Sequence, residues 1–314
     1  MYKAFYKLTR NPFEITPDPS FLFPTKKHNE ALASLYYGVR RHKGFVVLTG
    51  EVGTGKTLLL RCLLQLLKRN NDVAYAYVFN GRLSSVEFLQ YIAGDFGLPA
   101  AHKNKSELLL ELSNFVIDRG LKGLTTVLVV DEAHQLSTEI LEEIRLLTNL
   151  ETTQAKLLQI LLVGQPELDQ KLDSVELRQL KQRIAFRSQL LPLNLEETKG
   201  YIERRLQLAG ANSEEPELFP LETIAAIYRC ANGFPRLINT VCENALIAAY
   251  SKQLRSVTPE IIEDIATEFR LGVVQPSFPW SGHAGPANEN GVPNAARMLL
   301  ELYEHLQKAA GARE

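Results

Sequence analysis

Apolar and polar positions follow two alternating patterns over the first two thirds of the chain. Short apolar runs typical of buried strands alternate with stretches in which apolar residues recur every three or four positions, as in helices with one buried face. Strands that alternate with helices predict an α/β domain with a parallel sheet covered by helices on both faces. The predicted strands are 45–49, 73–79, 126–130, 158–163 and 189–193.

The pattern changes at residue 195, after which only helical periodicity occurs. We therefore expect an α/β core at 44–194, preceded by an N-terminal segment at 1–43, and a small all-α domain at 195–273. The helices predicted for this second domain are 196–208, 221–231, 235–250 and 259–269.

The C-terminal part has a different character. Residues 274–293 are rich in proline and glycine, which is typical of a linker. Residues 294–314 form a last predicted amphipathic helix, which could dock on its own chain or on a neighbouring subunit. Its apolar stripe comprises Ala295, Met298, Leu299, Leu302 and Leu306.

Composition narrows the classes of function. The 314 residues are 45% hydrophobic and 23% charged, as in a globular protein, and the net charge of -1 argues against a surface built throughout for nucleic acid or anionic lipid. The three cysteines lack metal-site spacing. The N-terminus lacks the apolar core of a signal peptide, and no run of about 18 apolar residues predicts a membrane helix. We expect a cytoplasmic protein without an integral membrane segment.

A glycine-rich motif follows the first predicted strand. Residues 50–57 read GEVGTGKT, between an apolar run and a helical run that begins at Leu58. Glycines let successive main-chain N–H groups surround an anion, and the helix that follows directs its positive end at the phosphates. The sequence therefore predicts a site for ATP and Mg²⁺, with Thr57 on the metal. The predicted phosphate-binding residues are Gly50, Glu51, Val52, Gly53, Thr54, Gly55, Lys56, Thr57 and Leu58.

Polar residues follow three other predicted strands. Asp131 and Glu132 end the strand 126–130, and we expect Asp131 to help hold Mg²⁺ and Glu132 to orient the attacking water. Gln165 follows the fourth strand and could sense the γ-phosphate, whereas Asn80 follows the second strand and could hydrogen-bond Glu132. Each could also be a simple turn residue.

Arginines supply candidate charges for the transferred phosphoryl group. Arg183, Arg178 and Arg187, in this order of preference, precede the fifth predicted strand, and one of them could reach the site of a neighbouring subunit. A solvated helix face is the alternative for each. Arg236 follows Pro235 at the start of a predicted helix and could face the nucleotide.

These residues together resemble the AAA+ ATPases, and more narrowly the general secretion pathway protein A group. The narrower resemblance covers about 1–270 and depends on Phe21 and on the stretches 5–6, 11–13, 17–19, 143–151, 164–168, 177–183 and 233–236. It implies an ATPase core with a helical lid that oligomerises with ATP at subunit junctions. It also implies an N-terminal segment close to the adenine, here near Phe13, Phe21 and His28.

The resemblance has one departure and leaves alternatives open. The transmembrane helix and periplasmic part of the secretion proteins do not follow Leu271, and similar cores serve in transposons as target-selecting regulators of the TniB and TnsC type. The leading expectation is an ATP-driven oligomeric switch that remodels a cell-envelope assembly through a protein client. The alternative is an oligomer on duplex DNA, with Lys103 and Lys105 as candidate contacts. A scaffold with negligible turnover is a third option.

A DEAH helicase is a further look-alike, because residues 131–134 read Asp-Glu-Ala-His. Such helicases need two RecA-like domains, and this chain has room for one. We therefore expect His134 to begin the loop after the strand.

Overall fold

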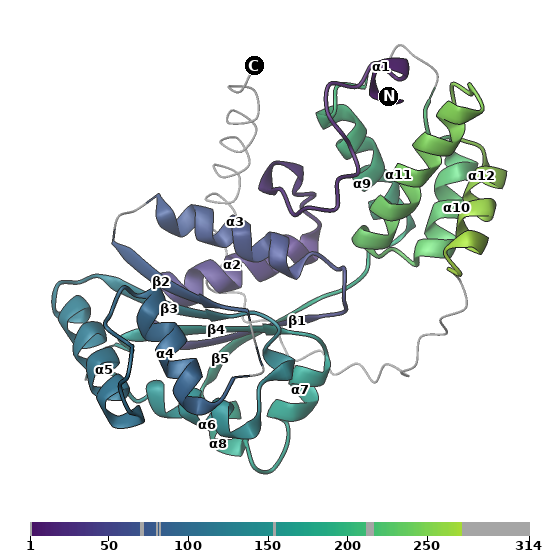
Figure 1. Cartoon of the computed structure of the whole chain (residues 1–314). Coiled ribbons are helices and arrows are strands. Elements are labelled where there is room, and N and C mark those ends of the chain that lie inside the picture. The colour runs from purple at the N-terminus through teal and green to yellow at the C-terminus, as the bar shows by residue number, and fades with distance from the viewer. Residues whose placement is uncertain are drawn as a thin grey trace.

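The computed structural model describes residues 2–69, 72–79, 81, 83–152, 155–211 and 217–271. An α/β core and a helical lid are joined by the segment that follows the last strand (Figure 1). The elements of the core are α2 (Lys26–Arg40), β1 (Phe45–Gly50), α3 (Lys56–Lys68), β2 (Val73–Val78), α4 (Ser85–Asp95), α5 (Lys105–Leu121), β3 (Thr125–Val130), η2 (Ala133–Gln135), α6 (Thr138–Leu147), β4 (Leu158–Gly164), α7 (Glu167–Leu172), α8 (Arg178–Lys181) and β5 (Ile184–Leu190). The N-terminal elements are α1 (Tyr2–Phe5) and η1 (Pro19–Phe21), and those of the lid are α9 (Leu195–Leu208), α10 (Leu221–Ala231), α11 (Pro235–Ser251) and α12 (Pro259–Glu268).

The sheet has five parallel strands in the order β2-β3-β4-β1-β5, which confirms the predicted fold class. β1 lies between β4 and β5, so the chain crosses from one side of β1 to the other after β4. Ligands of open parallel sheets bind at the carboxyl ends of the strands where the strand order reverses. The ends of β3, β4 and β1 are adjacent, and this adjacency positions the candidate site.

Alternating side chains of each central strand pack on opposite faces of the sheet. Leu128 and Val130 join the core beneath α4 to α8, whereas Val127 and Val129 join the core beneath α2 and α3. Figure 1 shows these two helical layers on either side of the sheet. Burial on both faces explains why the central strands read as continuous apolar runs.

The fifth strand begins earlier than the sequence predicted. Its bounds are Ile184–Leu190 rather than 189–193, so Arg187 lies within the strand and not before it. β5 is an edge strand whose residues alternate between half-buried and exposed. Its sequence therefore lacks the continuous apolar run of a central strand, and the prediction selected the more apolar residues that follow.

One part of the N-terminal segment packs on the lid and another part packs on the α/β core. Tyr2, Tyr6 and Phe13 belong to the apolar core of the lid, whereas α2 packs on the sheet. Phe13 is fully buried and its ring meets Phe219 edge-on at 5.7 Å between centroids. The ring of Phe13, which the resemblance had suggested for the adenine side, is thus a core residue of the lid with no exposed surface.

The linker at 274–293, the C-terminal helix expected at 294–314 and the candidate Asn80 lie outside the described residues. Among the helices that the structure describes, none combines the length and the apolar character needed to cross a membrane.

Candidate functional site

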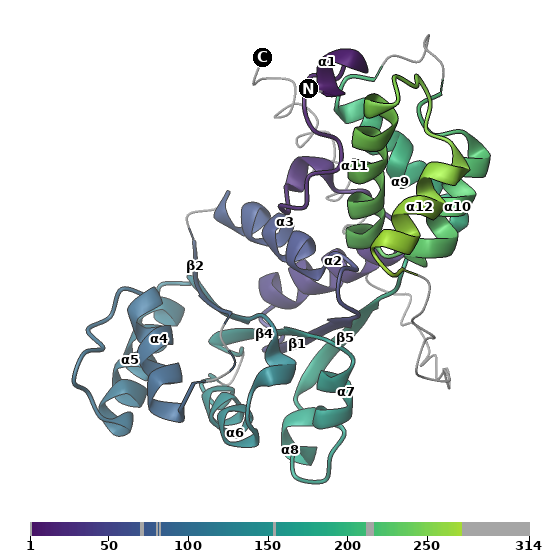
Figure 2. The ribbon, with the colours of Figure 1, turned by 45° about the vertical axis from the view of Figure 1, so that its right-hand side comes forward.

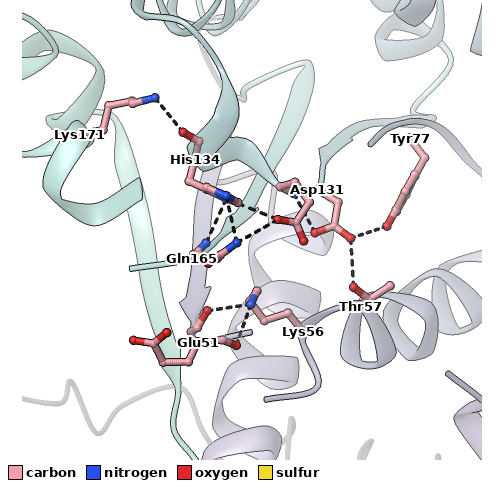
Figure 3. Close-up of polar contacts among 10 residues, drawn as sticks. Glu51, Lys56, Thr57, Tyr77, Asp131, His134, Gln165 and Lys171 are labelled. Atoms are coloured by element: carbon pink, nitrogen blue, oxygen red, sulfur yellow. Dashed lines mark hydrogen bonds and ion pairs between the residues drawn. The ribbon is translucent and has the colours of Figure 1, made fainter. Parts of the chain in front are cut away.

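The glycine-rich loop joins β1 to α3 at the carboxyl edge of the sheet. α3 begins at Lys56, directly after Gly55. The ammonium of Lys56 is buried and donates to the carbonyl oxygens of Gly50 at 2.7 Å and Glu51 at 3.0 Å, so it points back over the loop (Figure 3). Burial lowers the pKa of Lys56, and the nearby carboxylates of Glu132 and Asp131 oppose this shift.

Asp131 is held from three directions at the end of β3. Its carboxylate accepts a hydrogen bond from Thr57 at 3.2 Å, one from the Tyr77 hydroxyl at 2.8 Å and one from the main chain of Glu132 at 2.9 Å. Burial and the adjacent Asp131 raise the pKa of Tyr77, so the phenol remains a donor. A carboxylate beside a hydroxyl is a set of oxygen ligands that suits Mg²⁺, which keeps waters and phosphate oxygens as its other ligands. Thr57 and Asp131 therefore fit the metal.

Glu132 lies opposite Gln165 across the ends of β3 and β4. The Gln165 amide lies 3.5 Å from the Glu132 carboxylate and 3.0 Å from Nε2 of His134 (Figure 3). Glu132 has a backbone φ of 53°, in the left-handed region that residues other than glycine seldom adopt. Strain of this kind is concentrated at functional sites. His134 lies within η2, directly after the strand, and its Nδ1 is also 3.5 Å from the Glu132 carboxylate.

The lid contacts the glycine-rich loop through the start of α11. The main-chain N–H of Arg236 donates to the carbonyl oxygen of Gly53 at 3.3 Å. Gly233, three residues earlier, has φ of 74°, and a Cβ there would lie 1.9 Å from the carbonyl oxygen of Leu193. Only glycine allows this close approach, which fixes where α11 starts relative to the segment that leaves the core. The guanidinium of Arg236 is exposed beside the loop.

The three arginines considered for the site of a neighbouring subunit have different surroundings. Arg183 donates to the carbonyl oxygen of Arg145 at 3.2 Å and to the hydroxyl of Thr148, so it caps the end of α6. Arg187 pairs with Asp169 at 3.3 Å and with Asp173. Arg178 is exposed at the start of α8. Of the three arginines, Arg183 and Arg187 thus have partners within the chain, whereas Arg178 faces solvent.

The two lysines considered for DNA are ion-paired within the chain. Lys103 lies 2.6 Å from Glu111, and Lys105 pairs with Glu143. Glu143 is buried, with 7% of its surface exposed. Lys105 thus compensates a buried carboxylate, and both lysines already have an acidic partner within the chain.

Sequence reasoning missed Tyr77 as a contact of this machinery, and it did not predict the contact of His28 with the loop. Tyr77 lies inside β2, and no sequence motif marks it as a partner of Asp131. His28 touches the loop through the Thr54 carbonyl oxygen at 3.2 Å, although the two are far apart in sequence. The resemblance had suggested His28 for the adenine side, and no local motif signals its contact with the loop.

The sheet order together with this loop and the two acids defines a P-loop protein of the AAA+ type. Residues 39–172 match the family model described as an AAA domain. The resemblance to general secretion pathway protein A is also confirmed: the chain is 44% identical to that protein from Aeromonas hydrophila over 80% of its own length. It spans 45% of that protein, which is less than half.

More distant relatives widen the comparison. The chain is 27% identical to the ATP-dependent target DNA activator B of Escherichia phage Mu, over 82% of this chain and 76% of that protein. Among solved structures, Cdc6p from Pyrobaculum aerophilum matches with a TM-score of 0.62 at 19% identity, over 82% of this chain and 70% of that one. The ORC2 protein of Aeropyrum pernix matches with a TM-score of 0.61 at 18% identity, over 85% and 73%. These structural likenesses concern the fold.

Proposed function

We propose that this chain binds ATP with Mg²⁺ and hydrolyses it to ADP and phosphate at a site completed by a second copy. The observation that carries the proposal is the convergence of Lys56, Asp131 and Glu132 with Gln165 at the adjacent ends of β1, β3 and β4. Phosphoryl transfer needs positioning and charge compensation more than covalent chemistry, and these residues provide both.

Each residue has a distinct role in this proposal. The main-chain N–H groups of residues 50–58 and the Lys56 ammonium hold the phosphates. Thr57 and Asp131 hold Mg²⁺, which compensates phosphate charge when bound. Glu132 orients a water molecule and draws its proton, while Gln165 donates to the γ-phosphate. The side chain of Arg236, at the start of the lid helix α11, contacts the nucleotide. This contact couples nucleotide binding to the position of the lid.

We assign the arginine supplied to the neighbouring subunit to Arg178 before Arg183. Arg178 is exposed on the short helix α8, whereas Arg183 already satisfies the carboxyl end of α6 and Arg187 is paired with two aspartates. A guanidinium in this role must reach a neighbour without giving up its own partners. The proposed assembly is a homo-oligomer, ring or filament, in which hydrolysis depends on association.

For the biological role we propose an ATP-driven switch that organises a secretion or export assembly of the cell envelope from the cytoplasmic side, through a protein client. The support is the 44% identity to general secretion pathway protein A, which extends over 80% of this chain. Because the chain spans less than half of that protein, the client and any membrane attachment belong to the proposal.

A second candidate is an oligomer on duplex DNA. The likeness to target DNA activator B favours it, because it extends over most of both chains. The intramolecular ion pairs of Lys103 and Lys105 speak against these two lysines as its contacts. A contact of one or two phosphates per subunit could still add up along an assembly.

Phosphate release at increasing protein concentration tests the proposal. Turnover per subunit should rise steeply with concentration if neighbours complete the site, and Lys56→Ala should abolish it. Normal turnover in both Lys56→Ala and Glu132→Gln would contradict the proposed chemistry. Fluorescence anisotropy of labelled duplex DNA, with and without ATP and at two salt concentrations, separates the two roles. An ATP-dependent, salt-sensitive signal supports the DNA role, and a constant baseline removes it.

A further inference from the structure

An N-terminal strap, residues 2–25, runs from the lid to the start of α2. Main-chain and side-chain bonds attach it to the end of α9: Thr9 donates to the carbonyl oxygen of Ala209 at 2.8 Å, and Arg10 donates to that of Leu208 at 2.9 Å. Arg205 of α9 donates in turn to the carbonyl oxygen of Pro12 at 2.7 Å. η1 of the strap contacts both α3 and α9, and Figure 2 shows it near both helices. The strap thus connects the lid with the helix that follows the glycine-rich loop.

Directly after the strap, in the first turn of α2, a buried histidine touches the loop. Thr25 is the N-cap of α2 and accepts the main-chain N–H of His28 at 3.2 Å. Nδ1 of His28 lies 2.7 Å from the Thr25 hydroxyl, and Nε2 lies 3.2 Å from the carbonyl oxygen of Thr54. His28 is 6% exposed, so water does not compete freely for these bonds.

The hydrogen bonds decide which ring nitrogen carries the proton. A carbonyl oxygen only accepts, so Nε2 must donate to Thr54. The Thr25 hydroxyl can then donate to the unprotonated Nδ1, while its oxygen accepts the N–H of His28. Burial lowers the pKa of His28, against smaller opposing effects of the Thr54 carbonyl and Glu197, which favours this neutral form.

The contact matters because of the planarity of the peptide bond. The carbonyl of Thr54 and the N–H of Gly55 belong to one trans peptide unit and point in opposite directions. A donor that holds the Thr54 oxygen toward α2 therefore turns the Gly55 N–H toward the interior of the loop, where phosphate binds. The neighbouring carbonyl of Gly53 is held in the same way by the main chain of Arg236, from the lid.

We infer that His28 is a positioning residue of the phosphate-binding loop, which fixes the Thr54–Gly55 peptide so that its N–H faces the phosphates and which links the lid, through the strap, to that peptide. The inference rests on the proposed function, since it requires a phosphate ligand in the loop. His28 itself touches neither nucleotide nor metal in this role. It acts through the main chain of the loop.

Two amide variants of the full chain test the inference. The nitrogen of glutamine at position 28 can take the place of Nε2, whereas the shorter asparagine cannot reach the Thr54 oxygen. His28→Asn should therefore weaken binding of Mg-ADP by about tenfold, the value of one buried hydrogen bond, and His28→Gln should stay within about twofold of the parent chain. Isothermal titration calorimetry with Mg-ADP and with inorganic pyrophosphate measures both. Thr223→Val, which removes a buried hydroxyl bonded to the Val257 carbonyl oxygen within the lid and outside the strap, is the matched control and should bind like the parent.

The outcomes separate the inference from the function on which it rests. Loss of affinity for both probes in His28→Asn, with recovery in His28→Gln, supports it. Parental affinity in His28→Asn, or a loss for ADP with unchanged pyrophosphate binding, overturns the inference and leaves the proposed function in place. Absence of binding in the parent chain overturns both. Should His28→Asn unfold, His28→Met fills the volume without a donor, and parental affinity there would equally overturn the inference.

Discussion

The main-chain N–H of Arg236 lies 3.3 Å from the carbonyl oxygen of Gly53, so the first turn of a lid helix is bonded to the backbone of the glycine-rich loop. Lid and loop therefore share a contact that contains no flexible side chain. A rotation of the lid must either break this bond or move the loop. This relationship gives a direct physical route by which nucleotide binding and lid angle influence one another.

Gly53→Ala should disturb this contact. Gly53 has φ of 83°, and a Cβ there would lie 2.9 Å from Cβ of Arg236, so both backbone strain and a clash push the lid away. We expect Mg-ADP affinity to fall about tenfold, for a cost of about 1.4 kcal/mol. Titration calorimetry measures it. Gly94→Ala is the control, because no atom lies within 4 Å of its added Cβ; equal affinity in the two variants would refute the prediction.

Lys56→Ala and Glu132→Gln should separate binding from chemistry. Loss of the Lys56 ammonium removes a charge from the phosphates and should abolish measurable ATP binding. Glu132→Gln retains the phosphate contacts but cannot accept a proton, so turnover should fall by about 10² or more at nearly unchanged affinity. Equilibrium binding and phosphate release, measured side by side, check the two expectations. A Glu132→Gln protein with parental turnover would exclude Glu132 from the reaction.

Arg178→Ala and Arg183→Ala should have opposite signatures. Arg178→Ala should keep the melting temperature and lower turnover by about 10³, the effect of a missing trans guanidinium. Arg183→Ala should lower stability by about 2 kcal/mol, because it removes the two hydrogen bonds that the charged guanidinium donates at the end of α6. Differential scanning calorimetry and phosphate release distinguish them.

Mixing variants tests whether the Arg178 site is shared between copies. Neither Arg178→Ala nor Glu132→Gln should be active alone, but a junction that joins Glu132 of the first variant with Arg178 of the second is complete. An equimolar mixture should therefore regain part of the parental turnover. A mixture that stays inactive, although the two proteins co-assemble by light scattering, would contradict the trans assignment.

His28 should contribute a pH dependence to stability. Because its pKa is lowered from 6.5 in the folded chain, the unfolded chain binds the proton more readily between the folded pKa and 6.5. The contribution is complete above pH 6.5 and is lost as the pH falls toward the folded pKa. Urea unfolding at several pH values should show a steeper acid loss of stability for the parent than for His28→Gln. Parallel curves would indicate that His28 titrates alike in both states.

Lys105→Ala should act on stability rather than on DNA. The substitution leaves the buried carboxylate of Glu143 without its cation and should cost about 1 kcal/mol. Lys103→Ala removes a pair whose Glu111 partner is 40% exposed and should be nearly neutral. Urea unfolding compares the two variants. Any ATP-dependent DNA signal should survive both substitutions, and its loss in either would restore that lysine as a phosphate contact.

The sequence by itself determined the features that depend on local pattern. Apolar runs and helical periodicity gave the parallel sheet with its two helical layers and the helical lid. The stretch 50–57 and the pair Asp131–Glu132 predicted a nucleotide site at two strand ends, and Thr57 and Asp131 do lie within hydrogen-bond distance there. These succeed because strand burial, loop geometry and helix polarity are set by neighbours in the sequence.

Only the tertiary structure decided the features that depend on distant partners. It moved β5 to Ile184–Leu190, because an edge strand half open to solvent carries no continuous apolar signal. It placed Phe13 in the lid core and engaged Arg183 at the end of α6. It also brought His28 to Thr54 and Arg236 to Gly53. Which donor meets which carbonyl is set by the packing of whole elements, and no local motif encodes that packing.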